Sequence, residues 1–303
     1  MRATVTSSDK ADRARLLAGI AAACVVLLGI LYVLAVRTSW GQRLGDAALG
    51  GRVVERPRVQ HAMRELLDTI SISSIALLGL GIVAIALFRG RFHLAVAAGA
   101  VIVGSNVTTQ LLKKAILTRP ALIASSALPD GNSFPSGYAT VAMSVALAFV
   151  VVVPTRLRGV AALFGVAYST LVGMAVLGAG WHRPSDAVGA YLVVTAWAAA
   201  ATGVLVLRHG DREVGRARRP GPIVMPMLAI VGVLALAAAF VLLAGLLLAL
   251  HRGRLEAVDV DLAYLTGSAA IAGAGLLLVA VLLGAIRGID LDEPRGHATA
   301  VSA

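Results

Sequence analysis

The stretch NSFPSGYAT, residues 132–140, places small side chains and a glycine directly before an apolar run. Free backbone amides at a helix N-terminus bind anions, and glycine lets a ligand approach the backbone closely. Serine is also a preferred N-cap residue, so Ser136 taken alone indicates the start of a helix and no more. What the stretch does depends on the side chains that the rest of the chain brings to it.

Outward from this stretch, the chain consists of long apolar runs. Of the 303 residues, 58% are hydrophobic and 14% are charged, and the charges form short clusters between the runs. This pattern predicts a protein that crosses a membrane several times. The net charge of +11 reflects basic residues that flank the runs, which favours membrane topology and anionic lipid headgroups over nucleic acid. The single cysteine, Cys24, lies inside the first run, which excludes a disulfide framework or a cysteine metal site.

Eight runs are long enough to cross a bilayer core. They cover residues 16–36, 68–88, 93–113, 137–153, 158–180, 186–207, 222–249 and 263–286. An even number of spans places both termini on one side, and the excess of Lys and Arg there predicts cytoplasmic termini in the plasma membrane. The loops after the first, third, fifth and seventh spans then face outward. The longest of them, residues 37–67, is expected to hold a short interfacial helix around 59–67.

The predicted organisation has five parts. They are a cytoplasmic N-terminal segment (1–15), a six-span unit (16–207), a basic cytoplasmic loop (208–221), a two-span C-terminal extension (222–286) and a disordered cytoplasmic tail (287–303).

The third run carries polar residues towards its end, in GSNVTTQLLKKAILTRP, residues 104–120. Asn106, Gln110 and Lys113 are spaced i, i+4 and i+7, which places them on one face of a helix. Polar groups in a span either hydrogen-bond to neighbouring helices or line a site, and lysines at a span end also snorkel to the surface. Both interpretations remain open for the Asn and Gln, whereas the lysine and Arg119 face two further clusters.

The last of these clusters is GWHRPSDAVGA, residues 180–190, at the start of the sixth run. Pro184 suits the first turn of a helix. Because His182 and Asp186 are four residues apart, the carboxylate can bond one ring nitrogen, fix the tautomer and leave the other nitrogen free to react. A His–Asp cap at the membrane interface has the same pattern, so the pair alone does not establish catalysis.

Taken together, the clusters indicate phosphate chemistry. The loops after the third and fifth runs hold cations, an amide-rich helix start and an oriented imidazole. Cations and helix-start amides bind phosphate, and an imidazole beside a phosphate suits in-line attack on phosphorus.

These residues resemble the superfamily of type-2 phosphatidic acid phosphatases and vanadium haloperoxidases, in its membrane lipid-phosphate phosphatase branch. That family carries Lys, six residues, Arg-Pro; then Pro-Ser-Gly-His; then Ser-Arg, five residues, His, three residues, Asp. The placement matches over residues 16–207, with the first two motifs between the third and fourth spans and the last between the fifth and sixth. The resemblance implies an all-α integral membrane fold, a six-helix phosphatase core to which this chain adds two C-terminal transmembrane helices.

The resemblance also implies a role for each matching residue. His182 would be the nucleophile that forms a phosphohistidine, and Asp186 would orient it. The groups expected to hold phosphate oxygens are Lys113, Arg119, Ser136 and the amide of Gly137. Tyr138 occupies the position of the acid that protonates the leaving group, and no metal or other cofactor would be needed.

Two departures from the family pattern concern the first and second motifs. Only five residues separate Lys113 from Arg119, and on an unbroken helix this spacing turns the two side chains about 120° apart. Residues before Pro120 are, however, biased out of a helix. Tyr138 replaces the motif histidine, and a phenol is a much weaker acid than imidazolium at neutral pH.

The third departure removes a phosphate ligand, because Val176 stands where the family has arginine and Ala175 where it has serine. Arg183 or a first-loop arginine (Arg52, Arg56, Arg58 or Arg64) could replace the missing arginine. His61 could replace the acid at the position of Tyr138, and Lys114 is the alternative to Lys113.

Two functions follow. The first is a membrane phosphatase that hydrolyses a lipid phosphate or a polyprenyl diphosphate at the extracytoplasmic face through a phosphohistidine. Because a weak general acid matters least when the leaving group is itself a phosphate, Tyr138 favours a diphosphate over a monoester. The second is a catalytically impaired relative that binds lipid phosphates or acts as a membrane partner protein, since two of the family's chemical groups are lost. A transporter or channel is disfavoured, because outside these motifs the spans lack buried acidic residues.

Overall fold

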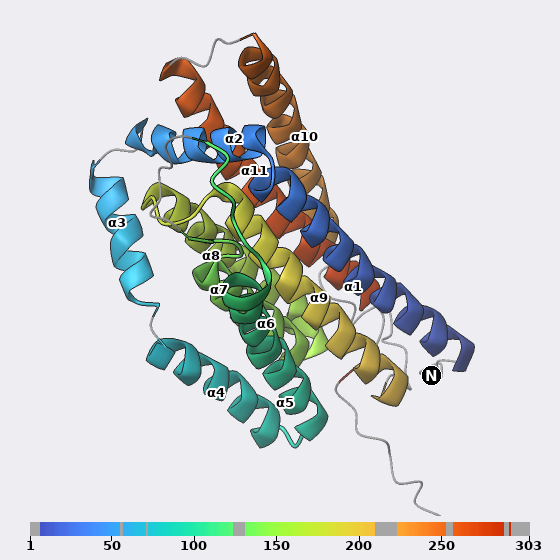
Figure 1. Ribbon diagram of the computed structural model, residues 1–303. Coiled ribbons are helices and arrows are strands. Elements are labelled where there is room, and N and C mark those ends of the chain that lie inside the picture. Colours follow the sequence, from blue (N-terminus) through green and yellow to red (C-terminus); the bar gives the residue numbers. More distant parts are fainter. Residues whose placement is uncertain are drawn as a thin grey trace, which may run out of the picture.

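The computed structural model describes residues 7–54, 57–70, 72–123, 131–209, 223–252, 257–287 and 291. The described residues form helices and no strand, as Figure 1 shows, which confirms the all-α class. Arg56, most of the predicted basic loop 208–221, and the tail beyond residue 287 apart from Leu291 lie outside the described residues.

The helices follow the apolar runs closely. The first part of the chain forms α1 (Ser7–Val36), α2 (Ser39–Gly50), the 3₁₀ turn η1 (Gly51–Val54), α3 (Pro57–Asp68) and α4 (Ile72–Phe88). The third predicted span is one continuous helix, in which α5 (Phe92–Gly99) and α6 (Ser105–Leu111) alternate with the π-helical turns η2 (Ala100–Gly104) and η3 (Leu112–Ile116). The rest forms α7 (Gly137–Val152), the 3₁₀ turn η4 (Thr155–Leu157), α8 (Arg158–Gly178), α9 (Pro184–His209), α10 (Val224–His251) and α11 (Ala257–Ala285). α3 confirms the short helix predicted around 59–67.

The predicted number of spans is supported only in part. Among the described residues, six helices are long and apolar enough to cross a membrane, and an eight-span count is not confirmed. The predicted spans 68–88 and 137–153 fall on shorter apolar helices, Leu77–Phe88 and Gly137–Val152. The 16 residues of α7 extend about 24 Å, less than the roughly 30 Å of a hydrocarbon core. Because α7 is buried along nearly its whole length, its apolar composition reflects burial within protein.

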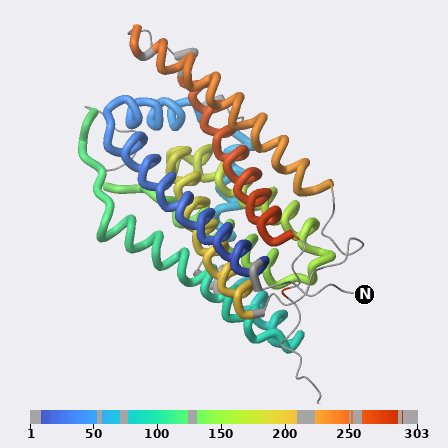
Figure 2. The backbone as a smooth tube through the Cα atoms, turned by 90° about the vertical axis from the view of Figure 1, so that its right-hand side faces the viewer, coloured from blue at the N-terminus to red at the C-terminus, as the bar shows by residue number. Residues whose placement is uncertain are grey.

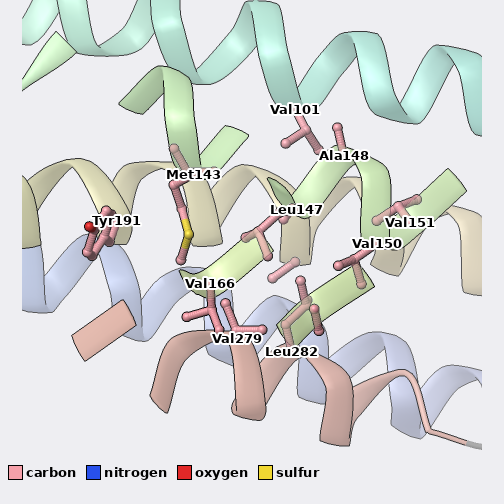
Figure 3. Packing of buried hydrophobic residues seen from close by; sticks show 14 of the residues in the cluster. Val101, Met143, Leu147, Ala148, Val150, Val151, Val166, Tyr191, Val279 and Leu282 are labelled. Atoms are coloured by element: carbon pink, nitrogen blue, oxygen red, sulfur yellow. The ribbon is translucent and has the colours of Figure 1, made fainter. Parts of the chain in front are cut away.

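The core of the bundle surrounds α7 (Figure 3). Met143 and Leu147 of α7 belong to one cluster of buried apolar side chains with Val166 of α8 and Val279 of α11. α11 also contacts α2 and α9, so the C-terminal helix pair joins the core through α11. α10 packs mainly along α11 and exposes large apolar side chains such as Phe240, as a helix surrounded by lipid would.

The two ends of the bundle hold different parts of the chain. At one end, Arg13 donates from Nη1 to the carbonyls of Ala285 (3.2 Å) and Arg287 (2.9 Å), so the start of α1 lies beside the end of α11. At the other end, Gln42 of α2 donates to the carbonyl of Pro120 (2.7 Å). α2 lies across this second end in both Figure 1 and Figure 2. The loops that follow η3 and α8 meet here, beneath α2.

Candidate active site

The stretch 132–140 starts α7, as its sequence predicts. Ser136 has extended backbone (φ −73°, ψ 123°), and its hydroxyl accepts a hydrogen bond from the N–H of Ala139, which is the N-cap arrangement. The N–H of Ser136 donates to the carbonyl of Asp186 (2.9 Å). The loops that carry the second and third motifs are therefore hydrogen-bonded to each other. The N–H groups of Gly137 and Tyr138, which precede the capped N–H of Ala139, have no partner within the helix, as an anion-binding helix start requires.

His182 and Asp186 form a buried pair. Only 6% of His182 is exposed, and its Nδ1 lies 3.3 Å from Oδ2 of the fully buried Asp186. The same carboxylate oxygen accepts from the hydroxyl of Ser133 (2.7 Å) and from the N–H of Arg183 (3.1 Å). These donors stabilise the carboxylate in its charged form. A charged carboxylate at Nδ1 holds the proton on that nitrogen and leaves Nε2 as the reactive atom.

The turn between α8 and α9 sets the position of His182. α8 ends at Gly178, and Gly180 has a positive φ of 76°, which permits the reversal of the chain. The carbonyl of Val176 then accepts from the N–H groups of Trp181 (2.9 Å) and His182 (3.1 Å). Pro184 opens α9 in the next turn, as its position in the sequence predicts.

The helix that carries Lys113 ends before Arg119, the arginine of the first motif. Lys113 lies in the π-helical turn η3, and Leu117 is already extended (φ −96°, ψ 135°). The angle expected for an unbroken helix therefore does not apply to the spacing of Lys113 and Arg119, and the bias of residues before a proline explains why. Nδ2 of Asn132 lies within hydrogen-bond distance of the carbonyls of Lys113 (3.3 Å) and Leu117 (3.1 Å), which ties this loop to the start of α7.

Arg119 is the least satisfied cation of the site. Its Nη1 and Nη2 atoms are buried and have no hydrogen-bond partner in the described part of the chain. Burial and the nearby Arg183 lower the pKa of Arg119, whereas Asp186 and Asp46 act in the opposite direction. Lys113 also interacts electrostatically with Asp186. The two cations of the first motif therefore lie within electrostatic range of the His–Asp pair.

Arg183 is the buried cation nearest to the pair. It is 1% exposed, and its Nε and Nη2 atoms donate to Oδ1 of Asp46 in α2, at 2.7 and 2.6 Å. Its Nη1 lies 3.4 Å from the Ser133 hydroxyl, which in turn bonds Asp186. Sequence reasoning missed Asp46 and Ser133. The sequence feature that could have identified Asp46 is that it is the only acidic residue between positions 37 and 54.

Tyr138 and Val176 share an apolar cluster. The ring of Tyr138 contacts Trp181 in a tilted arrangement, with ring centroids 5.3 Å apart, and packs against the buried cluster that contains Val176 and Leu67 of α3. Position 176, where the family has arginine, is thus enclosed by apolar side chains.

The other candidates lie at the margin or elsewhere. Arg52 packs against Gly180, because a Cβ added there would lie 3.0 Å from its Nε. His61 is exposed on α3 and pairs with Glu65 (3.2 Å). Lys114 is exposed and lines a groove with Asn106 and Gln110. The remaining described first-loop arginines, Arg58 and Arg64, are exposed.

Of the polar residues on α6, Asn106 donates to the Ser144 hydroxyl of α7 (3.2 Å) and so connects two helices.

Residues 92–210 match the family model of the PAP2 superfamily. The match includes the three motif regions, whereas α10 and α11 lie outside it. Neither a curated protein nor a solved structure matches the chain.

Proposed function

We propose that this protein is a membrane phosphatase for a lipid phosphate, because residues 92–210 match the family model of the PAP2 superfamily, whose members are phosphatases. The proposal rests on one observation. The buried nitrogens Nη1 and Nη2 of Arg119 have no acceptor among the described residues, and they lie within electrostatic range of the carboxylate that orients His182. Unpartnered buried donors are costly. A phosphate held in front of the imidazole supplies the acceptors they lack.

The chemistry follows from the arrangement of the donors. Nε2 of His182 attacks phosphorus, the bond from phosphorus to the leaving oxygen breaks, and its electron pair departs with that oxygen. Asp186 stabilises the positive charge that develops on the ring. Water then cleaves the phosphohistidine and releases inorganic phosphate. Lys113 and Arg119 hold the phosphate oxygens, together with Ser136 and the amide of Gly137, and no step needs a metal ion.

Arg183 replaces the arginine that is missing at position 176. Asp46 holds its Nε and Nη2 atoms, and Nη1 extends towards Ser133 at the edge of the His–Asp pair. Its positive charge acts on Arg119, which supports a location beside the same phosphate. Arginine is suited to this role because its planar guanidinium bonds two partners at once.

The substrate is a diphosphate, such as a polyprenyl diphosphate. Tyr138 is the residue at the acid position, and its ring is packed on Trp181 beside an apolar cluster. A phosphate leaving group departs without a strong acid, whereas an alcohol does not.

The reaction takes place at the extracytoplasmic face of the plasma membrane, with cytoplasmic termini and eight crossings. Two of these crossings are the shorter helices α4 and α7, and α7 crosses inside the bundle, surrounded by protein. The excess of basic residues on the terminal side supports this orientation. The contact of Arg13 with the end of α11 is consistent with an even number of crossings, since the site lies at the opposite end.

Phosphate release by the purified full-length protein tests the proposal. We expect release from geranylgeranyl diphosphate to exceed release from dioleoyl phosphatidic acid, and His182→Ala to lower it at least about 10³-fold. His61→Ala, a substitution of an exposed histidine, serves as the control and should leave the rate unchanged. Equal background release by wild type and His182→Ala would instead favour the impaired relative that only binds lipid phosphates.

A further inference from the structure

A cavity of about 300 Å³ lies between the C-terminal helix pair and the rest of the bundle. Its wall is formed by α10 and α11 on one side and by α1, α2 and the start of α9 on the other. This volume falls within the range of small-molecule sites. The two helices that form one of its walls, α10 and α11, lie outside the family match.

The lining is almost wholly apolar. α10 contributes leucines such as Leu236 and Leu243, and α2 contributes Trp40. α11 presents a face of small residues, including Ala263, Gly267 and Ala270, which leaves the space open. Burying a charged group against such a lining is unfavourable, so only an apolar occupant fits.

The cavity shares a wall with the phosphate site. Pro184 and Ser185 line it and directly follow Arg183 in the chain. Gly45 also lines it, and a Cβ added at Gly45 would lie 3.0 Å from Cδ of Arg183. Gly267 of α11 packs closely on Pro184. The apolar space and the cationic site are therefore neighbours on two sides of one turn.

We propose that this cavity binds the hydrocarbon chain of the lipid whose phosphate is held at His182. The inference rests on the proposed phosphatase function. A single amphiphile satisfies both sides of the shared wall, with its phosphate among the cations and its chain among the leucines. The C-terminal helix pair then selects substrates by chain length, while residues within the family match perform the chemistry.

A cavity-filling variant tests the selection. Ala270→Leu places extra methyl groups in the cavity, and Ala272→Leu, at another half-buried alanine of α11 outside the lining, is the control. For Ala270→Leu, we expect kcat/KM for geranylgeranyl diphosphate to fall about tenfold or more, since each methylene displaced from an apolar site costs a factor of about four. The value for geranyl diphosphate and both values for Ala272→Leu should stay near wild type. An equal fall for both chain lengths, or no fall for the longer chain, overturns the proposal.

A binding measurement separates failure of this inference from failure of the proposed function. A geranylgeranyl diphosphate analogue with a photoreactive group at its chain end should label peptides of α10 and α11 in wild type and in His182→Ala. Ala270→Leu should reduce this labelling, and Ala272→Leu should not. Labelling confined to other helices, or labelling that Ala270→Leu leaves unchanged, overturns the proposal even if phosphate release is normal. Labelling of α10 and α11 that Ala270→Leu reduces supports it even if no phosphate is released.

Discussion

Tyr138 and Val176, which replace two polar residues of the family motifs, are neighbours in one apolar cluster with Trp181. An arginine at position 176 would bring an unpaired charge among these side chains, which is strongly unfavourable. The two departures therefore belong together, since the ring of Tyr138 packs against the cluster that contains Val176. The buried cation beside the His–Asp pair is instead Arg183, held by Asp46 in α2.

The role of Arg183 is testable with a conservative change. Lysine keeps the charge of Arg183 but lacks the planar guanidinium that donates to Asp46 from two nitrogens and places a third beside Ser133. We expect Arg183→Lys to lower kcat/KM for geranylgeranyl diphosphate about 10–100-fold, the range for loss of one charge-stabilising donor. Arg37→Lys is the control, because Arg37 lies at the same end of the bundle and its guanidinium donates to the Thr118 hydroxyl. Equal values of kcat/KM for the two variants would show that Arg183 does not contribute to the phosphate site.

At the scale of elements, the site depends on three helix termini that differ in local structure. The helix of the first motif ends with the π-helical turn η3 before a proline, α7 begins at a serine N-cap, and α8 ends before a glycine turn. The bond from Ser136 N–H to the Asp186 carbonyl joins the start of α7 to the first turn of α9, which follows the glycine turn. Small changes in any of these turns should therefore act on catalysis before they act on the fold.

Substitutions at two glycines with similar backbone conformation distinguish the effect of backbone strain on stability from an effect on catalysis. Gly180 (φ 76°) precedes the reactive histidine and contacts Arg52, whereas Gly90 (φ 67°) lies at the other end of the bundle with open space around it. Gly→Ala at either position should cost about 1–2 kcal/mol of stability, the penalty for an L-residue in the left-handed region. Thermal unfolding in detergent measures this loss, and phosphate release measures function. We expect only Gly180→Ala to lower kcat substantially, and a similar loss for Gly90→Ala would show that strain alone explains the effect.

At the scale of the whole molecule, hydropathy predicts where the helices lie in the sequence but not whether protein or lipid surrounds each helix. The run 137–153 has the composition of a span, yet it forms the shorter buried helix α7, because burial in protein and exposure to lipid select the same residues. The His182–Asp186 contact is local and could be predicted from its spacing of four residues. The contact between Arg183 and Asp46 joins residues 137 positions apart, and no periodic pattern marks such a pair.

The orientation of the bundle predicts which end reagents reach from outside the cell. In a Cys24→Ala background, Ser39→Cys places an exposed thiol at the site end, and Arg156→Cys places one at the end that holds the start of α1. A membrane-impermeant maleimide should label the first variant in intact cells and the second only after permeabilisation. The reverse pattern would invert the proposed topology and place the site in the cytoplasm.

The central claim is that two loops distant in sequence form one anion site around the imidazole of His182. Rapid quenching of the reaction with geranylgeranyl diphosphate, followed by mass spectrometry under conditions that preserve phosphohistidine, tests it most directly. We predict a phosphoryl group on His182 in wild type, formed more slowly in Asp186→Asn and absent in His182→Ala. Phosphate release without any phosphoryl group on His182, or a phosphoryl group on another residue, would contradict this account.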